Sequence, residues 1–251
     1  MSYTLVIKDV HTHPGDNFNR HEAVGNMIVE EEPDEIIIVG DFASLDSCSQ
    51  YDTIRRCTMQ EDVEAIRTGY DKMFGPMLKA NKTRRKKYKP RTIFCEGNHE
   101  EREKRIRKHD PDGYASMIDF DSIMVPPDLF KEHYRYGQIV NVRGVDYTHC
   151  PLNTMGKAAS MAWIRKHTAR HLIWGHTHRM MLETIPQVGA KNSVRGLLNG
   201  PALLDQDTKE HYCLDSTTGW TYGLLRVYPR GADRMFMYDY IDTEELETLY
   251  T

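Results

Sequence analysis

The stretch from Thr92 to Glu100 constrains the fold more than any other part of the sequence. Its first four residues form a short, apolar, β-prone run, a glycine follows at position 97, and Asn98 and His99 come directly after it. The next residues, 101–108, are mostly charged and favour a helix. This order predicts a strand, a tight turn and a helix start. Because open α/β sheets bind ligands beyond the carboxyl ends of their strands, we expect Asn98 and His99 to lie at a ligand site.

Two earlier segments repeat this arrangement. A β-prone run at Thr4–Ile7 leads to Asp9 and His11, and a continuous apolar run at Glu35–Val39 leads through a glycine to Asp41. A run that is apolar throughout is typical of a strand covered on both faces. An amphipathic helix is predicted between the two runs. The chain therefore begins as a β-α-β unit with a carboxylate or histidine after each strand.

The second half of the chain adds two more sets of polar residues after strands. A hairpin is predicted over Gln138–Thr148 and ends in His149, and a short strand at His171–Trp174 leads to His176 and His178. Further strands are predicted at Met181–Ile185, Val194–Leu198, Trp220–Tyr228 and Arg234–Tyr240. These late strands indicate a second, largely antiparallel sheet packed on the first, within an α/β fold.

Three further helices are predicted. A helix from Glu61 carries apolar residues at helical spacing, and Pro76 is expected to kink or end it. Another is expected over Met155–His167, and Asp242 and Glu245 have the spacing of a cap and its partner for a last short helix.

Two segments are irregular. Residues 44–60 are polar, which fits either a solvated loop or a lid beside Asp41. Residues 109–138 contain several turn signals, and we interpret them as an insertion or cap region of a single domain that spans residues 1–251.

Composition excludes several classes of protein. The net charge is −4, from 33 basic and 37 acidic residues, so no global field attracts nucleic acid or anionic lipid. The apolar runs are far too short to span a bilayer, and the first residues lack the pattern of a signal peptide. The five cysteines are scattered without a CxxC pair, as in reduced thiols. We therefore expect a cytoplasmic protein that does not contact membranes.

The polar sets after the strands have the chemistry of a metal site. They supply carboxylates, imidazoles and one amide oxygen, which suit Mn, Fe or Zn at a catalytic site better than a thiolate-rich structural zinc site. The set is too large for one ion and fits two ions that share a carboxylate. Its members are Asp9, His11, Asp41, Asn98, His99, His149, His176 and His178.

In this order the motifs resemble those of the calcineurin-like metallophosphoesterase superfamily. The superfamily pattern is D-x-H, GD, GNH[DE], H and GHxH. The chain has Asp9-Val10-His11, Gly40-Asp41, Gly97-Asn98-His99-Glu100, His149 and Gly175-His176-Thr177-His178. The resemblance extends from about Thr4 to Arg179. The sequence Gly40-Asp41-Phe42-Ala43-Ser44 looks most like that of phage-encoded members. It implies a metallophosphoesterase-like sandwich of two sheets flanked by helices.

The resemblance also implies a role for each motif residue. One ion would be held by Asp9, His11, Asp41 and His178. The second would be held by Asp41, Asn98, His149 and His176, with Asp41 bridging the two. A hydroxide between the ions would attack phosphorus in line. His99 would stabilise or protonate the leaving oxygen.

The chain departs from the superfamily at the second motif. Calcineurin-type protein phosphatases carry GDxxDRG there, whereas this sequence has Ser44 and Leu45 at the acid and arginine positions. The acid that orients His99 and an arginine that binds phosphate are therefore both absent, although Asp46 could replace the acid. This difference counts against a protein phosphatase, even though GNHE is the wording of those enzymes.

We also interpret four other features. His13 is a polar loop residue, or else a residue in the outer shell of the metal site or a substrate contact; Cys150 is a buried thiol; and Glu100 caps the following helix rather than acting as a base. The basic run Lys82–Arg91 is a solvated surface or a contact to a phosphate backbone.

Three functions follow from these observations. The first is a two-metal phosphodiesterase or phosphatase that acts on small phosphate esters. The second is a nuclease with the same site that holds DNA or RNA through Lys82–Arg91. The third, a scaffold without catalytic activity, is disfavoured because the ligand set and His99 are intact.

Overall fold

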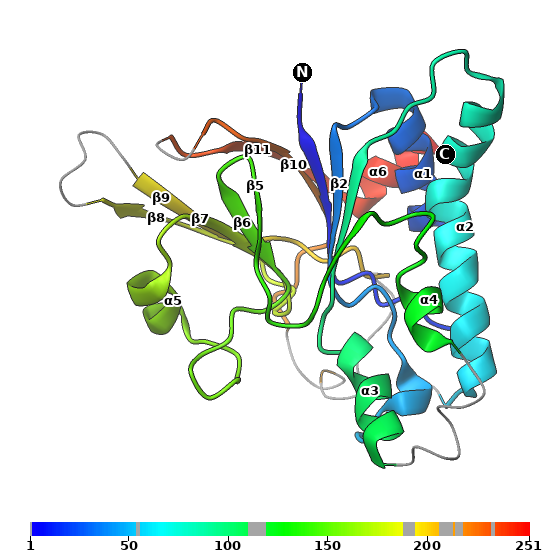
Figure 1. The fold of residues 1–251 in the computed structure, drawn as a ribbon, viewed down its shortest axis with the longest axis horizontal. Helices are drawn as coiled ribbons and strands as arrows, with labels where there is room; N and C mark the ends of the chain where they lie inside the picture. The colour runs from blue at the N-terminus through cyan, green and yellow to red at the C-terminus, as the bar shows by residue number, and fades with distance from the viewer. Residues whose placement is uncertain are drawn as a thin grey trace.

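Two β-sheets packed face to face form the centre of the molecule (Figure 1). The structure is a computed structural model, and it describes residues 2–53, 56–109, 119–187, 194–205, 213, 218–231 and 234–251. Within these residues, the first sheet has the strand order β11-β10-β1-β2-β3-β4 and the second has the order β5-β6-β7-β9-β8. The expected α/β fold of two sheets flanked by helices is confirmed.

The first sheet is built around the three strands that the sequence predicted first. Its parallel strands are β1 (Thr4–Ile7), β2 (Glu35–Val39), β3 (Arg91–Cys95) and β4 (Glu132–Tyr134). Two late strands, β10 (Gly223–Tyr228) and β11 (Met237–Asp242), pair antiparallel on the β1 side. Their expected place in the second sheet was wrong. Alternate residues of β10 are buried on opposite faces, Leu224 towards the helices and Leu225 towards the second sheet, which suits the first sheet.

The second sheet is mixed rather than largely antiparallel. Its strands are β5 (Val140–Val142), β6 (Val145–Thr148), β7 (His171–Trp174), β8 (Met181–Pro186) and β9 (Val194–Asn199). Strands β6, β7 and β9 run parallel, whereas β5 and β8 pair antiparallel at the two edges. The predicted hairpin is present, and its turn places Arg143 and Gly144 at positive φ values of 49° and 90°.

The apolar run of β2 shows how the layers are held together. Ile36 and Ile38 pack in the core against the helices, whereas Ile37 and Val39 pack against the second sheet. Neighbouring side chains of a strand point to opposite faces, so a strand between two apolar layers must be apolar at every position.

Helices cover the outer faces of both sheets (Figure 1). The first sheet is covered by α1 (Asn19–Glu31), α2 (Met59–Thr83) and α6 (Thr243–Tyr250), and the second by α5 (Met161–His167). The helix α3 (Glu100–His109) follows β3, and α4 (Phe120–Met124) packs beside α2. None of the helices in the described ranges is long and apolar enough to cross a membrane.

Helix α2 continues through Pro76, where a kink or an end was expected. Proline removes the hydrogen bond to the carbonyl of Lys72, four residues earlier. That carbonyl faces Gly25 of α1, where an added Cβ would lie only 2.5 Å from the oxygen. Close packing of α1 therefore shields the position and holds the helix together. In contrast, α5 begins at Met161 rather than Met155, because Ser160 caps its first turn.

The described part of the expected insertion belongs to the first sheet and its core. Strand β4 pairs with β3, and Phe120, Met124 and Phe130 are buried in the core on the helical side. Residues 110–118 lie outside the described residues. At the end of the chain, Asp242 caps α6 by accepting a hydrogen bond from the backbone N–H of Glu244.

Candidate metal centre

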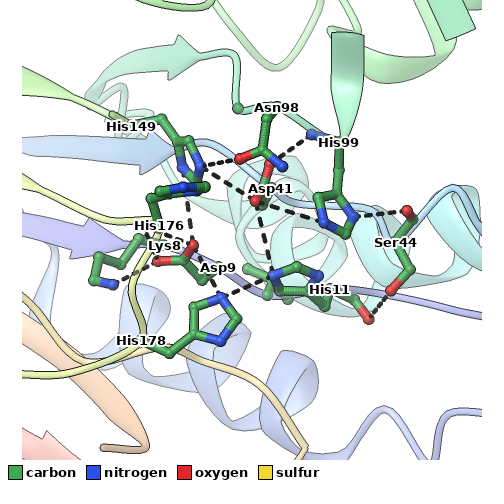
Figure 2. A network of polar contacts seen from close by, with 12 residues as sticks. Lys8, Asp9, His11, Asp41, Ser44, Asn98, His99, His149, His176 and His178 are labelled. Atoms are coloured by element: carbon green, nitrogen blue, oxygen red, sulfur yellow. Dashed lines mark hydrogen bonds and ion pairs between the residues drawn. The ribbon is translucent and has the colours of Figure 1, made fainter. Parts of the chain in front are cut away.

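Eight polar residues from five turns converge at one end of the two sheets (Figure 2). Each turn follows the carboxyl end of a strand: β1, β2 and β3 of the first sheet and β6 and β7 of the second. All seven residues expected to bind metal meet here, and His99 lies beside them. They are Asp9, His11, Asp41, Asn98, His149, His176 and His178.

Asp9, His11 and His178 form one group of three ligand atoms, all within 4.8 Å of one another. The Nε2 atoms of His11 and His178 are 3.1 Å apart, and Nε2 of His178 is 3.4 Å from Oδ1 of Asp9. All three side chains are buried.

Asp41, His149 and His176 form a second group with the same spacing. Nε2 of His149 lies 3.2 Å from Oδ2 of Asp41 and 3.0 Å from Oδ1 of Asn98. The same Oδ2 atom of Asp41 is 3.8 Å from Nε2 of His11 in the first group. Asp41 therefore lies between the two groups.

The residues present fit divalent ions. Buried carboxylates, imidazoles and an amide oxygen converge without a thiolate, which is the donor set of Mn, Fe or Zn at catalytic sites. Two imidazole nitrogens face each other at 3.1 Å, an arrangement in which at most one can donate to the other. A shared cation satisfies both lone pairs.

Three motif glycines leave room for ligands that come from other strands. A Cβ at Gly97 would lie 2.0 Å from Oδ1 of Asp41, and a Cβ at Gly175 would lie 2.7 Å from Oδ2 of Asp9. At Gly40, it would meet the ring of His149 at 2.6 Å. Real Cβ contacts essentially never come so close. Glycine is therefore required at the GD, GN and GH motifs, because a ligand side chain from a neighbouring turn packs against each of these positions.

The backbone at the site is strained. Five residues have left-handed φ values between 48° and 77°, namely Asp9, His11, Asp41, His176 and His178. Such a conformation costs a non-glycine residue roughly 1–3 kcal/mol and persists only where the surroundings enforce it. Each pair in D-x-H and H-x-H thereby directs both of its side chains into the same site.

Buried charges balance one another at the centre. The Nζ atom of Lys8 is 2.5 Å from Oδ2 of Asp9, and both residues are buried. Burial raises the pKa of Asp41, but His149 and His99 outweigh it and hold the pKa well below its usual value. Burial also lowers the pKa of His149, whereas the carboxylates of Asp41 and Asp9 raise it to about 9. The pocket is therefore arranged for positive charge beside ionised carboxylates.

Glu100 holds the turn that carries Asp41. Its Oε2 atom accepts hydrogen bonds from the backbone N–H groups of Gly97 at 2.7 Å and Asp41 at 2.9 Å, and Oε1 accepts one from Phe42 at 2.8 Å. Burial and the charge of Asp41 raise the pKa of Glu100 to about 7. Sequence reasoning assigned Glu100 to its own helix, and the structure adds this link to the neighbouring turn.

His99 is oriented by a backbone carbonyl. Its Nδ1 atom lies 2.8 Å from the carbonyl oxygen of Ser44, and its Nε2 atom lies 3.0 Å from Nη2 of Arg102. Asp46, which was expected to replace the missing acid, lies 3.4 Å from Arg102 instead. Burial lowers the pKa of His99 to about 4, and Arg102 acts in the same direction. The sequence did not single out Arg102, although its i, i+3 spacing from His99 at a helix start was a usable signal.

The site opens into a cavity of about 850 Å³. Residues 49 and 51–53 of the polar segment line it, which supports a role for that segment beside Asp41. Arg179 and Trp220 border it as well, and the Trp220 ring lies 4.6 Å from that of His178. Neither residue was predicted, because their position depends on the packing of the second sheet.

Two other predicted residues are structural. His13 is buried, and its Nε2 atom lies 3.0 Å from Oδ1 of Asp16, which also pairs with Arg20 at 2.8 Å. His13 thus lies in the loop after β1, as expected, but it is buried. Cys150 is a buried free thiol, as expected.

The basic run Lys82–Arg91 lies at the opposite end of the first sheet from the candidate metal centre. It precedes the amino end of β3, whereas Asn98 and His99 follow its carboxyl end. Two of its arginines are paired with carboxylates, Arg84 with Glu32 and Arg91 with Glu132. The run contributes no residue to the cavity.

The sequence profile of the calcineurin-like phosphoesterases matches residues 4–180. This range contains all the converging residues, and the two-sheet fold is the one that the resemblance implied. The chain belongs to the calcineurin-like phosphoesterase family. It is therefore a hydrolase of phosphate esters, and its family implies divalent metal ions.

Solved structures with a similar fold share little sequence with the chain. An archaeal phosphodiesterase is 14% identical with a TM-score of 0.47, over 95% of this chain and 99% of the other. The phosphoesterase YfcE from E. coli is 11% identical with a TM-score of 0.41, over 96% and 99%. The nuclease MPE from Pseudomonas putida is 14% identical with a TM-score of 0.37, over 89% and 83%. No curated protein sequence is significantly similar to the chain.

Proposed function

We propose that the chain is a two-metal phosphodiesterase or phosphatase, with Mn as the preferred ion. The observation that carries the proposal is the place of Asp41, whose Oδ2 atom lies 3.2 Å from His149 in one ligand group and 3.8 Å from His11 in the other. A carboxylate in that place can bridge two ions.

The residues divide between two ions as their groups suggest. Asp9, His11 and His178 hold one ion together with Asp41, and Asn98, His149 and His176 hold the other together with Asp41. When bound, the ions would supply Lewis acidity to the phosphoryl group and lower the pKa of a water molecule that serves as nucleophile.

In this proposal, His99 stabilises or protonates the leaving oxygen. The carbonyl of Ser44 accepts a hydrogen bond from Nδ1–H, so Nε2 faces the cavity, and Nε2 must take up a proton before it can act as the general acid. Although His99 also lies near His11 and Asp41, the guanidinium of Arg102 adjoins its Nε2 atom and opposes a cation there. His99 is therefore proposed as an acid and not as a ligand.

A nuclease is the second candidate, and the aromatic residues at the cavity favour it. Tyr51 is 80% exposed, and Trp220 lines the cavity beside His178. Exposed rings near a phosphate site can stack on nucleobases. The nuclease would thus bind its substrate through these residues rather than through the basic run.

Metal content and a substrate panel test the proposal together. After Mn loading, elemental analysis should find two equivalents per chain, and Asp41→Asn should retain at most one because both groups lose a shared carboxylate. The loaded protein should hydrolyse bis-p-nitrophenyl phosphate or p-nitrophenyl phosphate. Single- and double-stranded DNA in the same panel separate the nuclease from the small-ester enzyme. Binding of a single equivalent that Asp41→Asn leaves unchanged would exclude the two-metal site.

A further inference from the structure

Arg102 brings a guanidinium group to the cavity of the candidate metal centre. The second motif has Leu45 where calcineurin-type protein phosphatases have an arginine. Arg102 comes instead from the first turn of α3, three residues after His99, and it lines the same cavity as Asp41 and Asn98.

The guanidinium is held in a fixed orientation. Nη1 donates to the carbonyl oxygen of Ser44 at 2.7 Å and lies 3.4 Å from Oδ1 of Asp46, and Nη2 lies 3.0 Å from Nε2 of His99. The same Ser44 oxygen accepts from His99, so one carbonyl positions both side chains. The Arg102 side chain is only 17% exposed.

The arginine retains donors for a ligand. Its contacts use both hydrogens of Nη1 and one of Nη2, whereas Nε–H and the second Nη2–H have no partner among the described residues. A planar guanidinium with two donors on adjacent nitrogens matches two oxygens of a phosphoryl group.

We propose that Arg102 is the phosphate-binding residue of this enzyme and that it recognises the non-bridging oxygens of the reacting phosphoryl group. The inference rests on the proposed function for the identity of the substrate. Because a monoester dianion carries more charge than a diester monoanion, Arg102 contributes more to the binding of monoesters.

Binding of inorganic phosphate to Mn-loaded protein tests this without turnover. We expect Arg102→Ala to raise the calorimetric Kd of phosphate about 10- to 100-fold, and Arg102→Lys to lie between the two because a point charge replaces the fork. Metal content by elemental analysis should equal that of the wild type. Arg105→Ala is the charge-matched comparison, since it removes an exposed arginine one turn further along α3, and it should change the Kd less than about threefold.

Kinetics add a measurement that a purely structural role would not affect. The loss in kcat/KM for Arg102→Ala should be at least about fivefold larger with p-nitrophenyl phosphate than with the bis-p-nitrophenyl diester. Should Arg102→Ala not fold, Arg102→Gln, which keeps an uncharged polar side chain at this position, is judged by the same criterion. A Kd within about twofold of the wild type, or an equal loss in Arg105→Ala, would overturn the assignment. A wild type that binds phosphate but hydrolyses no ester would refute the proposed function instead.

Discussion

At the scale of single residues, His99 differs from its neighbours in what holds it. The seven ligand-type residues point at one another, whereas His99 is tied to the carbonyl of Ser44 on one side and to Arg102 on the other. These contacts hold its ring beside the ligand groups, where Nε2 is 4.0 Å from Oδ2 of Asp41. Removal of His99 should disturb the chemistry and leave the ions in place, because each of the two ligand groups has a carboxylate and two histidines without it.

We expect His99→Ala to lose about 100-fold or more in kcat on alkyl phosphate esters and less than about tenfold on nitrophenyl esters. A nitrophenolate leaves without a proton, so a general acid contributes little to its departure. Parallel kinetics on the two classes of ester, with metal analysis of each preparation, measure the difference. Equal losses on both classes would assign His99 a positioning role, and loss of metal would make it a ligand.

At the scale of elements, the site depends on how closely its turns approach one another. The turn between β3 and α3 packs Gly97 against the side chain and backbone of Asp41, which leaves no room for a Cβ. Glu100 then bonds both turns through one carboxylate. The turn that carries Asn98 and the turn that carries Asp41 therefore form a single unit.

Gly97→Ala should reduce the affinity for Mn at least about tenfold, because the new methyl group must displace Asp41 from both ligand groups. Gly75→Ala is the matched control. It lies in α2 with nothing within 4 Å of its Cβ position, so metal binding should stay unchanged while the free energy of unfolding rises by about 0.5–1 kcal/mol. Calorimetric titration with Mn and thermal melts of both variants are the measurements, and normal Mn binding by Gly97→Ala would show that the turns can separate.

The strands and site motifs could be read from the sequence because they are local patterns. In a run such as Glu35–Val39, the apolar character of the isoleucines and the valine indicates that they are buried, and a set of polar residues follows each run directly. The contacts of Arg102 and Glu100 with the turn after β2 could not be predicted, since they join residues 58 and 59 positions apart along the chain. Sheet membership of β10 and β11 also depends on such distant pairing.

At the scale of the whole molecule, the ligand groups and the basic run lie at opposite ends of the first sheet. The ligand groups lie at the carboxyl ends of the parallel strands, and the basic run lies before the amino end of β3. A five-residue strand separates them by roughly 16 Å. The run is therefore a surface feature remote from the reacting group.

Serine at Lys82, Arg85 and Lys86 should leave the binding of single-stranded DNA and its salt dependence within about twofold of the wild type. These three residues are exposed, whereas Arg84 and Lys87 have contacts within the protein and are kept. Fluorescence anisotropy across a salt series gives the slope, which reports the number of phosphate contacts. A shallower slope in the triple variant would show that the basic run contacts the DNA backbone.

The two sheets each supply part of the ligand set, and this division determines when the site can form during folding. Asp9 and His176 are 167 positions apart, yet the backbone N–H of His176 donates to the carboxylate of Asp9. Closing so long a loop comes late, after the local helices and the β-α-β unit have formed. The ions cannot direct the early steps, because an unfolded chain offers only isolated pairs such as His176 and His178. A metal ion held by residues of both sheets would therefore bind only after the two sheets have packed against each other.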